Sequence, residues 1–155
     1  LEILKDSTLG TYGTSALALV LLVEIAALAA LDPTTGLKSL VSAYAIGRSA
    51  SVCVMVFSRK AVREGLGADY ITELSVLRCA IGVFAAIFLV IALNGTQAAM
   101  LLVFALPPTV LMWAWSHRSI GGVVGDSLGA ITQLSQTRGL LGAVTLNSGV
   151  CACSW

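Results

Sequence analysis

The sequence predicts an all-α, multi-pass transmembrane helical bundle of about five helices. Of the 155 residues, 57% are hydrophobic and 11% are charged, whereas a soluble domain carries roughly 25% charged residues. The mean hydropathy is +0.94, and five apolar stretches approach the ~20 residues that a helix needs to cross a bilayer. We therefore treat residues 1–155 as a single integral membrane domain whose surroundings are the lipid bilayer.

The first two expected spans are Thr14–Leu31 and Leu37–Phe57. The string DPTTG at 32–36 separates them, because proline and glycine end a helix. Each span carries one charged residue near its middle, and such a residue is costly in lipid unless it faces a cavity or a partner. We expect Glu24 to pair with a neighbouring helix, outside the functional site. Arg48 is expected to have a functional or paired interior role.

The third and fourth expected spans are Leu74–Leu93 and Ala98–Trp115, joined by the short turn NGTQ at 94–97. Pro107 and Pro108 lie inside the fourth span. Proline lacks the backbone N–H and clashes with the preceding turn, so this pair is expected to kink or interrupt the helix.

The fifth expected span, about 127–150, is weaker and more polar than the others. Gln133, Gln136 and Arg138 lie within it. Polar side chains in a membrane segment usually face neighbouring helices. We therefore expect this helix to begin at the interface and to pack against other helices.

Basic residues indicate the orientation of the chain. If the segment before Thr14 is cytoplasmic, most basic residues lie on or near that side and only Lys38 lies opposite, as the positive-inside rule requires. The cytoplasmic set is Lys5, Arg59, Lys60, Arg63, Arg78 and Arg118. The same orientation brings three polar segments to one compartment, residues 5–13, 58–73 and 117–126, which predicts one cytoplasmic site.

Two polar, glycine-rich strings carry the candidate chemistry, KDSTLGTYG at 5–13 and SIGGVVGDSLGA at 119–130. Phosphoryl transfer requires cations, metal ligands and positioning around the phosphate oxygens. Asp6 and Asp126 are the candidate ligands for Mg²⁺, which takes one or two carboxylates plus water and substrate phosphates. Lys5 is either a phosphate cation or an interfacial anchor, and the sequence leaves both open.

Three glycines of the second string, Gly121, Gly122 and Gly125, allow the backbone to approach an anion without a side chain in the way. The alternative is that they let helices pack closely in the membrane. His117, close to these glycines in the sequence, is a candidate base. The alternative is that it is only a polar residue at the membrane boundary, which is the more common role of a lone histidine there. The four cysteines have no zinc-ligand spacing and are expected to be packing residues or part of the tail.

These residues resemble the cobalamin-5'-phosphate synthase family, also called adenosylcobinamide-GDP ribazoletransferase. Four ordered segments carry the resemblance along nearly the whole chain: LEILKDSTLGTYG at 1–13, AIGR at 45–48, REGLGADY at 63–70 and SIGGVVGDSLGA at 119–130. The family has a D-G-x-A-D-x-x-D motif upstream of its KDS segment, so we expect this chain to be the C-terminal part of a longer enzyme, inactive alone. Val124 replaces a threonine that the family usually carries.

The resemblance implies a magnesium-dependent membrane transferase of late cobalamin biosynthesis. It would move adenosylcobinamide phosphate from adenosylcobinamide-GDP to alpha-ribazole or alpha-ribazole 5'-phosphate and release GMP, on the cytoplasmic side of the bacterial inner membrane. The implied catalytic residues are Asp6, Asp126 and Lys5, and both aspartates are the implied metal ligands. Residues implied to bind substrate phosphate are Arg48, Arg63, Gly121, Gly122 and Gly125.

A small membrane transporter or channel component is the alternative. Buried charges and interrupted helices also build translocation sites, although no internal repeat is visible. Nucleic-acid binding is excluded, because the net charge is only +1 and no basic stripe exists to follow a phosphate backbone. The sequence leaves a homo-oligomer open.

Overall fold

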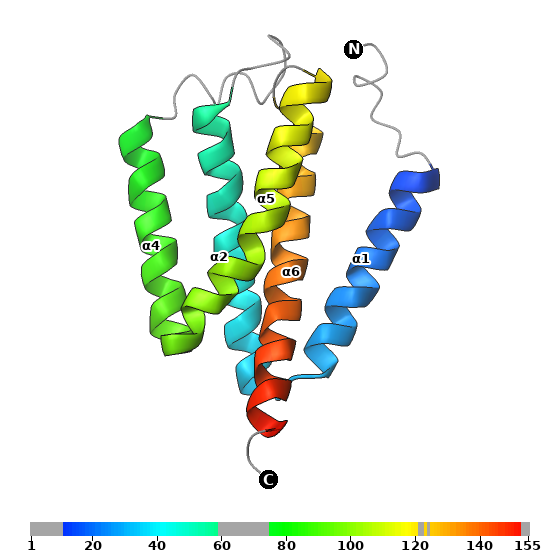
Figure 1. Cartoon of the computed structure of the whole chain (residues 1–155), viewed down its shortest axis with the longest axis vertical. Coiled ribbons are helices and arrows are strands. Elements are labelled where there is room, and N and C mark those ends of the chain that lie inside the picture. The colour runs from blue at the N-terminus through cyan, green and yellow to red at the C-terminus, as the bar shows by residue number, and fades with distance from the viewer. Residues whose placement is uncertain (1–10, 59–74, 121–122, 124, 153–155) are drawn as a thin grey trace.

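The computed structural model describes residues 11–58, 75–120, 123 and 125–152, and every element within them is helical. The helices pack side by side as a bundle (Figure 1). They are α1 (Thr11–Ala29), α2 (Pro33–Phe57), α4 (Val76–Asn94), α5 (Ala98–Ile120) and α6 (Gly125–Ala152). The predicted all-α fold is confirmed, and each helix lies where a span was expected.

The helix count needs a correction. A single 3-10 turn, η2 (Gly95–Gln97), joins α4 to α5 without a loop, so the described residues form four uninterrupted helical runs rather than five separate helices. The chain turns back on itself at η2 (Figure 1). Gly95 permits this turn because its φ of 55° is a conformation that favours glycine. Three runs are long and apolar enough to cross a membrane, namely Thr11–Ala29, Pro33–Phe57 and Val76–Ser119. The more polar α6 is not one of them.

The start of α2 also differs from the prediction. The string at 32–36 was expected to be a loop, but α2 begins at Pro33, within it. Asp32 is the N-cap, and its Oδ2 accepts hydrogen bonds from the Thr34 hydroxyl at 2.6 Å and the Thr35 amide at 3.0 Å. Proline is well suited to the first helical position, where no N–H is needed, so here it starts a helix.

The two prolines do not interrupt α5, which remains one helix from Ala98 to Ile120. Figure 1 shows its axis changing direction along its length, as expected for a proline kink. Thr109 Oγ1 donates back to the Ala105 carbonyl at 3.2 Å. Serine and threonine side chains in a membrane helix commonly satisfy backbone groups in this way near proline.

Helix α6 packs against α1, α2 and α5. Small residues allow the close approach: a Cβ built on Gly139 would lie 3.2 Å from Ala43 Cβ, and one on Gly142 would lie 2.9 Å from Phe104 Cγ. Ile131 of α6 is fully buried and packs in one cluster with Val54 of α2 and Met112 of α5. The expectation that this polar helix packs against its neighbours is therefore confirmed.

Hydroxyl and amide groups hydrogen-bond across the helix interfaces. Thr109 and Ser135 hydroxyls lie 2.7 Å apart between α5 and α6, and Asn94 Nδ2 donates to Ser42 Oγ at 2.6 Å between α4 and α2. Interhelical hydrogen bonds of this kind help membrane helices associate, because lipid supplies no hydrophobic drive between them.

Candidate functional site

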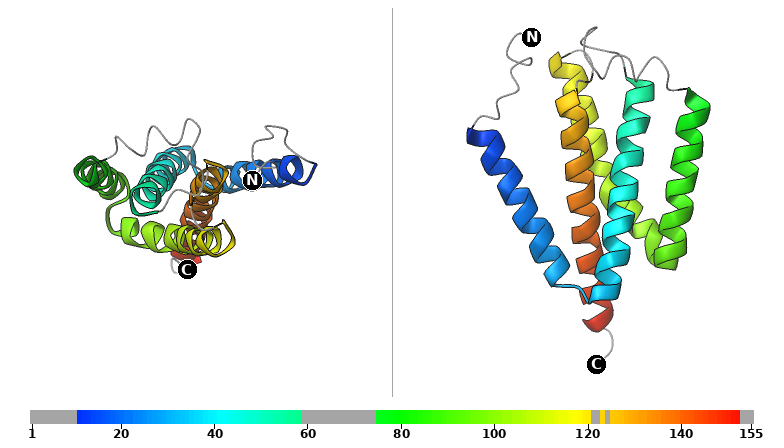
Figure 2. Two further views of the ribbon diagram at one scale, coloured as in Figure 1. Left: turned by 90° about the horizontal axis from the view of Figure 1, so that it is seen from above. Right: turned by 180° about the vertical axis from the view of Figure 1, so that it is seen from behind.

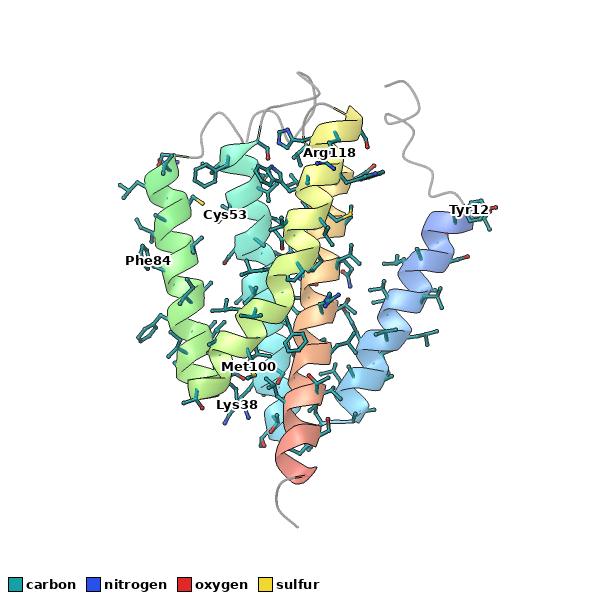
Figure 3. The ribbon with its side chains drawn as sticks, in the orientation of Figure 1. Tyr12, Lys38, Cys53, Phe84, Met100 and Arg118 are labelled. Atoms are coloured by element: carbon teal, nitrogen blue, oxygen red, sulfur yellow. The ribbon has the colours of Figure 1, made fainter. Side chains whose placement is uncertain are left out.

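The helix ends that flank the three polar segments lie at one end of the bundle. The starts of α1, α4 and α6 and the ends of α2 and α5 gather there, while the α1–α2 turn and η2 lie at the other end (Figures 1 and 2). Arg118 lies at the first end and Lys38 at the second (Figure 3). The predicted convergence of the polar segments at one end is therefore supported by where they join the helices.

The last turn of α5 is held against the first turn of α6. The Ser116 hydroxyl donates to Ser127 Oγ at 3.2 Å, and both residues are buried. Val123, between the two helices, packs in a cluster with Val54 and Ile131. These contacts fix the beginning of α6, where the second glycine-rich string enters the helix.

Asp126 lies exposed in the first turn of α6. A carboxylate there is favoured by the partial positive charge of the helix N-terminus. Gly125 is the first residue of the helix, and a Cβ added to it would meet no other atom within 4 Å. Close helix packing therefore does not explain Gly125, and its predicted role beside an anion stays open to test.

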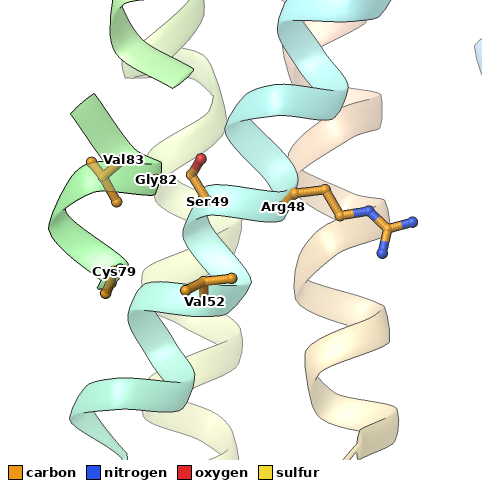
Figure 4. Close-up of a pocket in the computed structure, with 6 residues that line it drawn as sticks. All are labelled: Arg48, Ser49, Val52, Cys79, Gly82 and Val83. Atoms are coloured by element: carbon orange, nitrogen blue, oxygen red, sulfur yellow. The ribbon is translucent and has the colours of Figure 1, made fainter. Parts of the chain in front are cut away.

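Arg48 is exposed, and its guanidinium points away from a cavity of about 230 Å³ between α2 and α4 (Figure 4). This cavity is mostly apolar, so its lining does not resemble a phosphate-binding site. The cavity is lined by Arg48, Ser49, Val52, Cys79, Gly82 and Val83. No ion pair or hydrogen bond joins Arg48 to any other described residue, so the paired interior role is not seen. Phosphate binding by Arg48 stays a prediction.

Glu24 behaves as expected of a carboxylate that pairs with a neighbouring helix. It is only 6% exposed. Its Oε1 accepts a hydrogen bond of 2.8 Å from Gln133 Nε2 and lies 2.8 Å from Thr137 Oγ1, both on α6. The sequence could not identify these two partners, because helix adjacency is a tertiary property.

Trp113 links α5 to the end of α2, a contact that sequence reasoning missed. Its indole N–H donates to Ser58 Oγ at 2.8 Å. The same ring meets His117 edge-on, with ring centroids 5.4 Å apart and an interplanar angle of 85°. His117 Nε2 is buried and has no hydrogen-bond partner among the described residues.

Several predicted site residues lie outside the described residues, namely Lys5, Asp6, Arg63, Gly121 and Gly122. Within the described ranges, no group of three or more His, Cys, Asp or Glu side chains is placed to hold a metal ion. Cys53 and Cys79 are free thiols whose sulfurs lie 3.8 Å apart between α2 and α4. Their position agrees with the packing role expected for them.

A comparison with known protein families decides the relationship. The family model described as cobalamin-5-phosphate synthase matches residues 1–144. This chain belongs to the cobalamin-5-phosphate synthase family. The resemblance seen in the four ordered segments is thereby confirmed. No solved structure gives a significant match to the chain.

Three curated relatives of this synthase family, all named adenosylcobinamide-GDP ribazoletransferase, show how much of the protein is covered. The Clostridium acetobutylicum protein is 32% identical over 140 residues, which are 88% of this chain and 55% of the relative. The Escherichia coli protein is 34% identical over 139 residues, 88% of this chain and 56% of the relative. The Klebsiella pneumoniae protein is 35% identical over 146 residues, 91% and 58%. The chain thus spans a little over half the length of these relatives.

Proposed function

We propose that this chain carries part of an adenosylcobinamide-GDP ribazoletransferase. The observation that supports the proposal most strongly is the family match over residues 1–144, together with three relatives of that name at 32–35% identity. The arrangement of helix ends agrees with it, because the polar segments that match the family join the bundle at one end (Figure 1). No observation favours a transporter or a channel component.

In the proposed reaction, a hydroxyl oxygen of alpha-ribazole, or of alpha-ribazole 5'-phosphate, attacks the phosphorus that bears adenosylcobinamide. A new P–O bond forms, and the bond from this phosphorus to the oxygen of GMP breaks. The hydroxyl proton passes to solvent, and GMP leaves with the bond electrons. Such transfers depend on positioning and on charge neutralisation at the phosphate oxygens.

The residues that remain candidates divide by role. Asp126 is the described carboxylate at the converging helix ends, and Asp6 is its proposed partner. Lys5, Arg48 and Arg63 are proposed to neutralise the diphosphate. The backbone at Gly121, Gly122 and Gly125 is proposed to approach its oxygens.

An exposed carboxylate in the first helical turn fits a magnesium ligand, because Mg²⁺ keeps several waters and takes only one or two protein carboxylates. When bound, Mg²⁺ would neutralise charge on the diphosphate oxygens. The role of Asp126 would be to hold one coordination position at a fixed point, since the Ser116–Ser127 hydrogen bond fixes the first turn of α6 against α5.

We place the site on the cytoplasmic side of the bacterial inner membrane. Three apolar helical runs are long enough to cross a bilayer. Arg118 lies at one end of the bundle and Lys38 at the other (Figure 3), and Arg78 lies in the first turn of α4, which starts at the Arg118 end (Figure 1). The positive-inside rule then assigns that end to the cytoplasm.

The test is Asp126→Asn in the full-length protein, assayed for transfer from adenosylcobinamide-GDP with Mg²⁺. We expect turnover to fall on the order of 100-fold, the usual effect of removing one charge-stabilising group. Asp32→Asn is the matched control, because Asp32 is an exposed aspartate at the opposite end and asparagine also caps helices. Unchanged turnover in Asp126→Asn would remove this residue from the mechanism.

A further inference from the structure

Helix α1 buries few of its side chains in the bundle, and one of them is a carboxylate. Its buried residues are Glu24 and Ala27, and the helix packs mainly on α6, with a smaller contact to α2. In lipid, apolar side chains have no hydrophobic drive toward a neighbouring helix, so interhelical hydrogen bonds carry much of the specificity of helix association. The polar contact of Glu24 with α6 is therefore a specific attachment of α1 to the bundle.

The contact is made to two successive turns of α6. Gln133 Nε2 and Thr137 Oγ1 both lie 2.8 Å from Glu24 Oε1. The Thr137 hydroxyl has a single proton and also lies 2.9 Å from the Gln133 carbonyl oxygen, so Gln133 provides the unshared hydrogen bond. Because the two donors are one turn apart, they fix both the rotation of α1 and its height along α6.

The same face of α6 carries Asp126. The spacing Asp126, Ala130, Gln133 and Thr137 is i, i+4, i+7 and i+11, which places these residues along one stripe of a helix. Both views of the bundle show α1 meeting α6 near the C-terminal end of α1 and diverging from it toward the N-terminal end (Figures 1 and 2). A change at the Glu24 contact would therefore move the start of α1 relative to Asp126.

We infer that Glu24 is a positioning residue that fixes α1 to α6 and so sets the separation between the first turn of α1 and Asp126. Its consequence for catalysis rests on the proposed function, because the string with Lys5 and Asp6 leads directly into α1. An ionisable residue inside a membrane segment is a candidate for function by default. Here the contact geometry assigns it a role between two helices rather than at the reacting atoms.

The first test measures the helix separation without any turnover. Spin labels are placed on cysteines at positions 12 and 129, both exposed, in full-length protein whose native cysteines are serine. We expect a narrow distance distribution in the parent and in Glu24→Gln, because a glutamine Oε1 still accepts the Gln133 and Thr137 hydrogen bonds. Glu24→Leu should broaden and shift it. An identical distribution in Glu24→Leu would overturn the inference.

Two more variants keep the test decisive if Glu24→Leu does not fold. Gln133→Leu removes the unshared donor and should broaden the distribution clearly, whereas Thr137→Val removes the shared hydroxyl and should broaden it less. Asp126→Asn, in contrast, should leave the distribution unchanged. A distance distribution unaffected by Gln133→Leu would contradict the inference as directly as an unaffected distribution in Glu24→Leu.

The second test measures transfer from adenosylcobinamide-GDP. A residue that only positions reacting groups should affect kcat more than KM, so we expect Glu24→Leu to lower kcat roughly 10- to 100-fold, with Glu24→Gln restoring it. Equal loss in both variants would contradict a positioning role. The tests separate the two proposals, since absence of transfer activity in the parent would refute the proposed function and leave the distance result standing.

Discussion

Gly47 of α2 lies against Gln136 of α6 so closely that no side chain fits between the two helices. A Cβ on Gly47 would come within 2.7 Å of Gln136 Cγ and 2.9 Å of the Thr132 carbonyl oxygen. Gln136 is itself only 2% exposed. Because one of the two obstacles is backbone, an added methyl group can be accommodated only if α2 and α6 move apart.

Gly47→Ala should therefore destabilise the bundle. Overpacking of a well-packed interior typically costs about 1–3 kcal/mol, which exceeds the gain from the better helix propensity of alanine. The free energy of unfolding in detergent measures it. Gly82→Ala is the matched control, because a Cβ on Gly82 of α4 meets nothing within 4 Å, and it should leave stability equal or higher. Equal stability of both variants would show that α2 and α6 do not approach this closely.

The Thr109–Ser135 hydrogen bond between α5 and α6 should contribute measurably but modestly. A double-mutant cycle of Thr109→Val and Ser135→Ala should give a coupling energy of about 0.6 kcal/mol, the average for interhelical hydrogen bonds in a membrane protein. Ser15→Ala is a suitable control, because Ser15 only donates to the Thr11 carbonyl within its own helix. A coupling energy of zero would mean that the two hydroxyls do not interact across the interface.

Hydropathy and turn residues predicted the fold class and the approximate position of each described helix, because an apolar run of membrane length is visible without tertiary information. Two local features were wrong for physical reasons. Asp32 and Pro33 are typical of a helix start as well as of a loop. In the structure Asp32 caps α2, so the helix begins at Pro33. Gly95 allowed α4 to pass into α5 through a single 3-10 turn.

The candidate site was less accessible to sequence reasoning. Asp126 could be placed just before the fifth expected span, but nothing in the sequence shows that Arg48 is exposed or that Gln133 donates to Glu24. These facts depend on which face of each helix is covered and on which neighbouring helix covers it. Periodicity gives a face for each helix and does not give its partner. Pairing is therefore the information that the structure adds.

The two thiols between α2 and α4 offer a direct test of that pairing. Cys53 and Cys79 sulfurs lie 3.8 Å apart, so mild oxidation should join them in one chain, with both thiols oxidised and the added oxidant reduced. Peptide mass spectrometry after cleavage between the helices detects the link, in a background where Cys151 and Cys153 are serine. Cys79→Ser provides the unlinked control. Failure to form the link under conditions that oxidise other thiols would contradict the α2–α4 contact.

Asp32 should make the stability of α2 depend on pH. Hydrogen bonds from the Thr34 hydroxyl and the Thr35 amide hold the pKa of its carboxyl well below the usual range. A carboxyl whose pKa is lower in the folded state stabilises that state fully above its unfolded pKa of about 3.9, and this contribution is lost as pH falls toward the folded-state pKa.

The free energy of unfolding should therefore be measured for the parent and for Asp32→Asn between about pH 6 and about pH 3. Asparagine caps a helix nearly as well as aspartate but does not titrate, so the two proteins should differ little at the upper end. The parent should lose more stability than Asp32→Asn as the pH falls below about 4. Parallel pH profiles would show that the Asp32 charge does not contribute to the cap.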